Sequence, residues 1–186
     1  MRTCFSFPFN YNNNINIQSK SIRAGANAGT GPEGTDEEES SMSKNIVVIT
    51  GSPRKNGNSF AMTDAFIQAA QAKGHNVQRF DAAMMNIGGC HACETCFRTG
   101  RACSFDDDFN TIAPAILEAD AIVFTMPVYW YSIPAQIKAV IDRIYSLVVG
   151  GKDIAGKACA LIACCEEEDL TVLDGVRIPM ERTAAL

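Results

Sequence analysis

Four cysteines lie within one short segment of this chain, at a spacing typical of metal-binding loops. Cys90, Cys93, Cys96 and Cys103 follow the pattern C-x2-C-x2-C-x6-C. Two-residue gaps allow one loop to wrap a tetrahedral metal ion or one corner of a metal cluster, and the longer gap lets the last thiol reach the far side. Thiols without metal can instead form a reversible disulfide. A metal cluster, a zinc ion and unmetallated thiols are therefore three open interpretations of this loop.

A second candidate site is the loop of residues 51–59, G-S-P-R-K-N-G-N-S, which joins an apolar run at 46–50 to a helix-like stretch at 60–73. Glycines let the backbone turn tightly around an anion, and free N–H groups at the start of the next helix point at it. The loop lacks the Lys-Ser/Thr ending of a triphosphate P-loop and the third glycine of the dinucleotide-binding pattern. It predicts a site for a single phosphate, such as that of a mononucleotide, although an ordinary turn between strand and helix has a similar composition.

A third candidate is an aromatic loop, M-P-V-Y-W-Y-S-I-P at 126–134, which follows an apolar run at 121–125. One loop cannot bury three consecutive large rings. At the carboxyl edge of a parallel sheet, however, such rings could flank a flat cofactor ring. Without a cofactor, Tyr129, Trp130 and Tyr131 would cap the core.

Strand and helix patterns alternate from residue 44 onward, and this order predicts an α/β fold with a parallel sheet and right-handed crossovers. The apolar runs and the breaks at glycine and proline give the bounds of each element. We expect strands at 46–50, 76–81, 121–125 and 157–164, and helices at 59–73, 109–118, 134–149 and 170–185.

The two ligand loops occur in a specific order: G-S-P-R-x-x-G-N-S at 51–59, then P-V-Y-W-x-x-x-P at 127–134, followed by Lys138 and Asp142-Arg143. Together they resemble the flavodoxin-like NAD(P)H-dependent FMN reductases, over residues 42–186. The resemblance implies a flavodoxin-like, doubly wound parallel sheet that holds FMN at the carboxyl ends of its strands, with the phosphate in the first loop and the isoalloxazine against the second. It assigns FMN binding to Ser52, Arg54, Asn56, Asn58, Ser59, Pro127, Val128, Tyr129 and Trp130.

The cysteine loop, C-H-A-C-E-T-C-F-R-T-G-R-A-C with Asp107 and Asp108 after it, resembles the compact cysteine motif of the iron–sulfur flavoproteins within the same superfamily. This likeness implies a [4Fe–4S] cluster near FMN, with the four cysteines as its ligands.

The same resemblance implies the reaction. NAD(P)H would pass hydride to FMN, and a small molecule or a redox protein would accept the electrons. No catalytic side chain is required, because the cofactor carries the chemistry. A homo-oligomer is also implied. Two alternatives stay open: a flavodoxin-type electron carrier without NAD(P)H activity, and a non-catalytic metal-binding domain.

The composition argues against some classes of function. A chain of 186 residues with 47% apolar content can form one domain with an adequate core. Its net charge of −5 argues against nucleic acid as a partner, and its apolar runs are too short to predict a membrane span. Eight cysteines without a secretory leader favour a cytoplasmic setting, where thiols stay reduced.

The two ends of the chain carry separate expectations. Residues 1–41 combine an Asn-rich stretch, small residues and an acidic run, which predicts a disordered extension outside the fold. The FMN-binding domain would then occupy 42–186. It would stop before the fifth strand and closing helix of a flavodoxin-like sheet, so that the strand at 157–164 becomes a bare edge.

Overall fold

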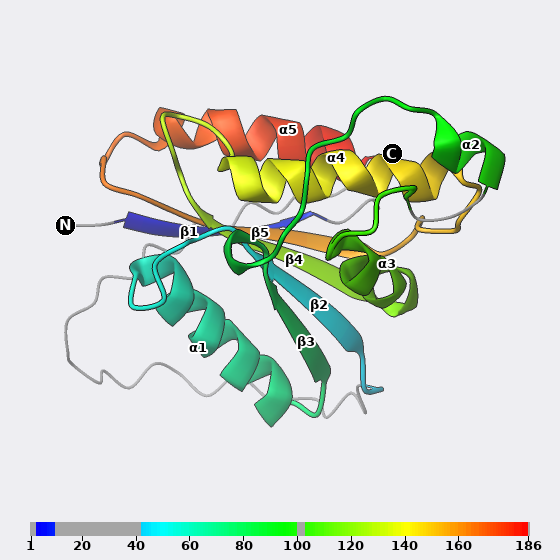
Figure 1. Ribbon diagram of the computed structural model, residues 1–186. Coiled ribbons are helices and arrows are strands. Elements are labelled where there is room, and N and C mark those ends of the chain that lie inside the picture. Colours follow the sequence, from blue (N-terminus) through cyan, green and yellow to red (C-terminus); the bar gives the residue numbers. More distant parts are fainter. Residues whose placement is uncertain (1–2, 10–41, 100–102, 186) are drawn as a thin grey trace.

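The computed structural model describes residues 3–9, 42–99 and 103–185. Its centre is a sheet with the strand order β1-β5-β4-β2-β3 (Figure 1). Neighbouring strands from β2 to β5 pair in parallel, whereas β1 pairs antiparallel with β5. The predicted parallel α/β sheet is therefore confirmed. The strands are β1 (Thr3–Phe9), β2 (Asn45–Thr50), β3 (Asn76–Asp81), β4 (Ala121–Pro127) and β5 (Ala158–Cys165).

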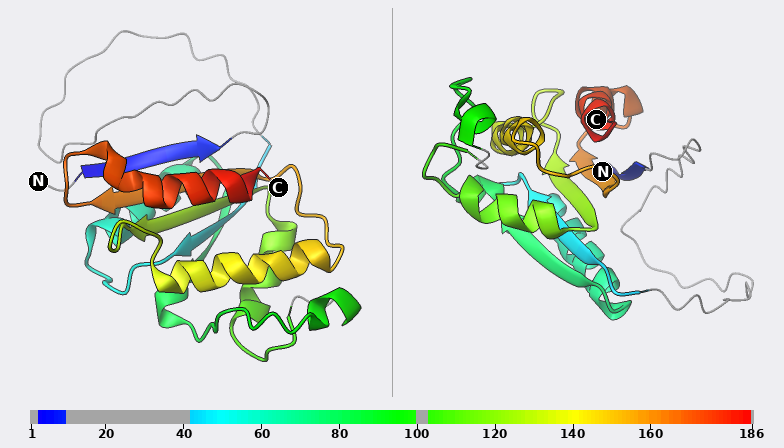
Figure 2. Two further views of the ribbon diagram at one scale, coloured as in Figure 1. Left: turned by 90° about the horizontal axis from the view of Figure 1, so that it is seen from above. Right: turned by 90° about the vertical axis from the view of Figure 1, so that its right-hand side faces the viewer.

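Helices cover both faces of the sheet. Figures 1 and 2 show α1 on one face and α3, α4 and α5 on the other. Within the described residues, no helix combines the length and apolar character needed to cross a membrane. The helices are α1 (Asn58–Ala72), α2 (Thr95–Thr99), α3 (Phe109–Glu118), α4 (Ala135–Val149) and α5 (Asp174–Ala184), with short 3-10 turns η1 (Ala82–Met84) and η2 (Leu170–Leu173).

The alternation of side chains along the strands divides the core into two parts. Val47 and Ile49 of β2 join the buried cluster beneath α3, α4 and α5. Ile46 and Val48 join a smaller cluster beneath α1. Because both faces of the sheet are covered at its centre, the strands β2, β4 and β5 read as nearly continuous apolar runs. Polar groups that could act on a ligand are left to the loops at the strand ends.

The outer strand β1 corrects the expectation that residues 1–41 all lie outside the fold. Thr3–Phe9 pairs along the whole of β5, with Thr3 opposite Cys165 and Phe9 opposite Cys159. The edge of β5, expected to be bare, is therefore covered. A period-two pattern was present in the sequence, since Phe5, Phe7 and Phe9 alternate with smaller residues. Residues 10–41 of the predicted extension lie outside the described residues.

The last predicted helix is divided in two. Residues 170–185 begin as the turn η2 and continue as α5. The Asp169 side chain accepts a hydrogen bond from the Thr171 N–H at 2.9 Å, which caps the first piece. The other predicted strands and helices lie within two residues of the observed bounds.

Gly51, the residue after β2, packs so closely against α4 that it has no room for a side chain. A Cβ at Gly51 would lie 2.2 Å from Cγ1 of Ile137. We expect Gly51→Ala to lower the free energy of unfolding by about 1–3 kcal/mol, because the added methyl group overpacks a filled core. Urea unfolding measures this. Gly89→Ala is the matched control, since no heavy atom lies within 4 Å of its added Cβ; an equal loss in both variants would contradict the packing argument.

Candidate functional site

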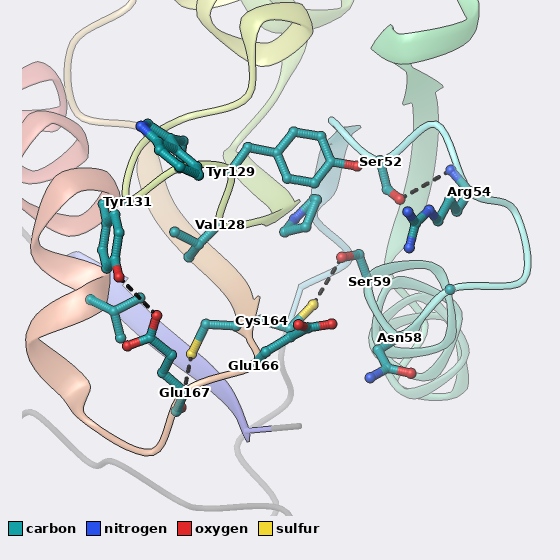
Figure 3. A pocket seen from close by; sticks show the side chains of 15 residues that line it. Ser52, Arg54, Asn58, Ser59, Val128, Tyr129, Tyr131, Cys164, Glu166 and Glu167 are labelled. Carbon is teal, nitrogen blue, oxygen red and sulfur yellow. Dashed lines mark hydrogen bonds between the residues drawn. The ribbon is translucent and has the colours of Figure 1, made fainter. Parts of the chain in front are cut away.

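The main candidate site is a cleft of about 400 Å³ at the carboxyl ends of β2, β4 and β5. The loop after β2 forms one side of it, and the loop after β4 forms the other (Figure 3). The segment after β5 closes the floor between them. The lining residues are Ser52, Arg54, Gly57, Asn58, Ser59, Pro127, Val128, Tyr129, Trp130, Tyr131, Cys164, Cys165, Glu166, Glu167 and Val172.

The loop after β2 is ordered by its own hydrogen bonds. Ser52 is 4% exposed, and its Oγ accepts a hydrogen bond from the Arg54 N–H at 3.2 Å. The Gly57 N–H donates to the Arg54 carbonyl at 3.0 Å. Gly57 is the N-cap of α1, and no side chain among the described residues caps that end. The first N–H groups of α1 are therefore available to an anion in the cleft, beside the Arg54 cation.

Beneath this loop lies a small buried network of hydroxyl and thiol groups. Ser59 Oγ is hydrogen-bonded to Cys164 Sγ at 2.9 Å (Figure 3). Thr63 Oγ1 lies 2.7 Å from both the Ser59 carbonyl and Thr125 Oγ1. The network joins α1 to β4 and β5, so it fixes the start of α1 against the sheet.

The aromatic loop after β4 forms a tight two-residue turn. The Tyr129 and Ser132 backbones exchange two hydrogen bonds, of 3.1 and 2.9 Å. Trp130 and Tyr131, between them, have φ values of 47° and 62°. This conformation is that of a type I′ turn, which favours Asn and Gly and is strained for bulky residues. Trp130 is nevertheless 94% exposed, so burial of its ring does not offset the strain.

Two contacts hold the strained turn in place. A Cβ at Gly175, in α5, would lie 1.7 Å from the Tyr131 carbonyl oxygen, so only glycine allows α5 to approach the turn this closely. The Tyr131 hydroxyl donates to Glu167 Oε1 at 3.0 Å, on the side of the cleft formed by the aromatic turn (Figure 3). This hydrogen bond to a carboxylate raises the pKa of Tyr131.

The cleft brings together eight of the nine residues that the sequence assigns to FMN; Asn56 is not among those that line it. The sequence argument did not commit to Tyr131, Cys164, Cys165, Glu166, Glu167 or Val172, which also line the cleft. Five of these six belong to β5 or the segment after it. Their position after an apolar strand in a parallel sheet was the available signal.

The four cysteines line a second cavity, of about 200 Å³, beside α4. Cys90 and Cys93 are exposed, Cys96 and Cys103 are half-buried, and none of the four is in a disulfide. The other residues of its wall include Phe97, Phe105, Arg143, Tyr145 and Ser146.

Cys93 occupies the most distinctive position in this cavity. Its neighbours Ala92 and Glu94 have φ values of 51° and 57°, a strained conformation for residues with a side chain. Hydrogen bonds from Ser104 and then Thr95 lower the pKa of the Cys93 thiol to about 7. A thiolate is both the metal-binding and the nucleophilic form of cysteine, so this loop favours the reactive state.

The cysteine cavity suits an anionic, sulfur-bound group in its donor chemistry. Four cysteines line one space, and Arg143, also in its wall, has a buried Nε–H without a hydrogen-bond partner among the described residues. Among those same residues, no three or more His, Cys, Asp or Glu side chains already form a set that could hold a metal ion. The four cysteines therefore line a common cavity, but their side chains are not arranged as a metal-binding site.

Comparison with curated proteins finds iron–sulfur flavoproteins. One from Archaeoglobus fulgidus is 36% identical over 98 residues, which cover 53% of this chain and 44% of that protein. One from Methanosarcina thermophila is 34% identical over 112 residues, covering 60% and 57%. The chain spans about half the length of the curated relatives it matches.

Structural comparison supports the fold. The crystal structure of an apo NADH:FMN oxidoreductase superposes with a TM-score of 0.54 at 17% identity, covering 76% of this chain and 70% of the other. The sequence profile of the NADPH-dependent FMN reductases matches residues 44–171, which include the loop after β2, the cysteine loop and the aromatic turn. Since this match spans more than half of the chain, the protein belongs to the NADPH-dependent FMN reductase family.

Proposed function

We propose that this protein is an FMN-dependent oxidoreductase that takes hydride from NAD(P)H and passes the electrons to a small molecule or a redox protein. The observation that carries the proposal is the 400 Å³ cleft, in which an uncapped helix start and an aromatic turn face one another across the carboxyl ends of the strands. Membership of the FMN reductase family supports the same assignment.

The loop after β2 would hold the phosphate of FMN. Arg54 and Asn58 line the cleft, and the first N–H groups of α1 lie beside them. Ser52 orients the Arg54 backbone, and Ser59 would act mainly through its hydrogen bond to Cys164. A dianionic phosphate would therefore meet a cation, a helix dipole and backbone donors at one point.

The opposite side of the cleft would hold the isoalloxazine ring. Val128 and Tyr129 offer apolar and aromatic surface, and Trp130 and Tyr131 extend that surface to the rim. When bound, FMN supplies the hydride chemistry itself. The residues of the turn would orient the ring, shield one of its faces from water and leave the other accessible. None of the lining side chains needs to act as an acid or base.

Oligomeric state and location follow from the same proposal. Trp130 is 94% exposed beside Tyr131 at 58%, which is unusual for large aromatic side chains and is consistent with a second subunit covering the rim of the cleft. The reduced thiols of the cysteine loop suit the cytoplasm.

The cysteine cavity would hold a [4Fe–4S] cluster, with Cys90, Cys93, Cys96 and Cys103 as ligands. Its four thiols line one space of about 200 Å³, and the curated relatives are named iron–sulfur flavoproteins. A cluster there would exchange single electrons, which suits a partner to a two-electron cofactor. The alternatives are a zinc ion and thiols without metal. The experiment on Cys93 distinguishes both from the cluster.

Arg54 provides the first test. We expect Arg54→Met to weaken FMN binding by about 10- to 100-fold, or about 1.5–3 kcal/mol, because a charge-assisted hydrogen bond to phosphate is lost. Lys55→Met is the control, since it removes the same charge from a neighbouring residue that does not line the cleft. Flavin fluorescence titration measures both affinities.

In the wild type, NAD(P)H should bleach the absorbance of the bound flavin in the absence of oxygen. Binding of FMN without bleaching would indicate an electron carrier instead.

The strained turn provides the second test. Replacing Trp130→Asn together with Tyr131→Gly supplies the residues that a type I′ turn prefers. We expect this pair to raise the free energy of unfolding by about 1–2 kcal/mol while weakening FMN binding, because strain and flavin contacts reside in the same residues. In the control, Trp130→Ala with Tyr131→Ala, the affinity should fall without the gain in stability. An FMN affinity unchanged in both pairs would argue against the turn as the flavin site.

Cys93 provides the third test. After anaerobic purification, Cys93→Ser should contain much less iron and acid-labile sulfide than the wild type, because one cluster ligand is missing. Cys159→Ser, which alters a half-buried thiol of β5 outside the cavity, should keep the wild-type content. Metal analysis and the visible spectrum report the result. Zinc without sulfide in the wild type would identify a zinc site, and the absence of both metals would indicate thiols alone.

A further inference from the structure

Arg143 is the largest fully buried side chain of the described residues, and it lies in the wall of the cysteine cavity. It extends from α4 and is 1% exposed. Its guanidinium carbon lies 5.0 Å from the centre of the Phe105 ring and 4.9 Å from that of Phe109. A cation that is this buried requires partners for its N–H groups, because unpaired donors inside a protein are costly.

Asp107 and Gly88 occupy one end of the guanidinium group. Arg143 Nη1 donates to Asp107 Oδ2 at 2.8 Å and to the Gly88 carbonyl at 3.0 Å, and Nη2 donates to Asp107 Oδ1 at 3.0 Å. Burial is the largest single effect and raises the pKa of Asp107, but the hydrogen bonds from Arg143, Gly88 and Phe109 and the charge of Arg143 together outweigh it, so the pKa of that carboxyl lies below its usual value. The pair is therefore a fixed, bidentate ion pair.

The other edge of the guanidinium group has no such set of hydrogen bonds. An arginine carries five N–H donors in a planar fork, and the three contacts above use both hydrogens of Nη1 and one of Nη2. The remaining donors are the Nε–H and the second Nη2–H, which lie side by side. Nε is buried without a partner among the described residues. Leaving a buried charged donor unpaired is costly, so this edge suits an acceptor that binds in the cavity.

The contacts of Arg143 also prevent it from turning toward another acceptor. Gly88 precedes the cysteine loop and Asp107 follows it, so one side chain ties both ends of the loop to α4. The Gly88 N–H also donates to Asp107 Oδ2, at 3.2 Å. The remaining wall combines the aromatic rings of Phe97 and Tyr145 with polar side chains, which are those of His91, Glu94, Ser104, Asp142 and Ser146. Four cysteines line the same cavity, so their sulfur atoms and those of any group bound to them are candidate acceptors for the Nε–H edge.

We propose that Arg143 is a positioning residue of the cysteine cavity whose free Nε–H edge donates a hydrogen bond to a sulfur atom of the iron–sulfur cluster. The inference rests on the cluster in the proposed function. Hydrogen bonds to cluster sulfurs stabilise the more negative, reduced state and so raise the reduction potential. Because Asp107 neutralises the charge of Arg143, this effect comes from a directed donor at a fixed position and not from a net positive charge.

The test uses the full chain with reconstituted cluster, labelled with ¹⁵N-arginine. Pulsed EPR of the reduced protein should detect a ¹⁵N coupling, since Arg143 is the one arginine among the described residues that line the cavity. Arg143→Lys keeps a cation for Asp107 but has no Nε–H, so it should lose the coupling and shift the midpoint potential to a more negative value. Arg98→Lys, in α2 and outside that lining, is the matched control and should change neither.

The outcomes separate this inference from the proposal on which it rests. Wild-type protein without iron and sulfide after reconstitution would remove the cluster and the inference with it. A wild type that holds the cluster but lacks the ¹⁵N coupling, or an Arg143→Lys variant that keeps both coupling and potential, would overturn the role of Arg143 alone. If Arg143→Lys does not fold, the wild-type spectrum and its persistence in Arg98→Lys decide the question.

Discussion

The register of the three central parallel strands is the constraint on which both sides of the cleft depend. Thr50 at the end of β2 pairs with Thr125 of β4, which in turn pairs with Ile162 of β5. One further backbone bond ties each loop to the next strand: Gly51 N–H to the Thr125 carbonyl and Val128 N–H to the Cys164 carbonyl, both 2.8 Å. A slip of one residue would exchange the two buried faces, so the apolar alternation of the strands fixes the level at which the loops begin.

The candidate site contains strained backbone. The aromatic turn holds Trp130 and Tyr131 at positive φ, and the close approach of Gly175 and the hydrogen bond to Glu167 stabilise it from outside. Strain of this kind persists only when the surroundings determine it, and it concentrates at functional sites. The cysteine loop repeats the arrangement on a smaller scale, with Ala92 and Glu94 strained on either side of Cys93.

The sequence predicted those parts of the fold that local patterns determine. Apolar strands buried on both faces, a glycine-rich turn after the first of them and prolines around the aromatic loop were sufficient to predict the parallel sheet and most of the cleft. The strand β1 was missed because its partner, β5, is about 150 residues away in the chain and pairs with it antiparallel. The position of Glu167 after an apolar strand was an available signal, but its hydrogen bond to the hydroxyl of Tyr131 is a contact that no spacing encodes. Asn56 was assigned by likeness alone, and the turn of its loop leaves it outside the lining.

Helix α4 connects the two cavities. Pro134 precedes it at the end of the aromatic loop, Ile137 in its first turn packs against Gly51 of the loop after β2, and Arg143 lies in the wall of the cysteine cavity. Ile137 and Arg143 are six residues apart, or about 9 Å along a helix axis. Because a helix is stiff over this length, and all three contacts are buried or sterically tight, α4 holds the cleft and the cysteine cavity at a fixed separation. A group bound in one cavity would then lie at a fixed distance from a group bound in the other.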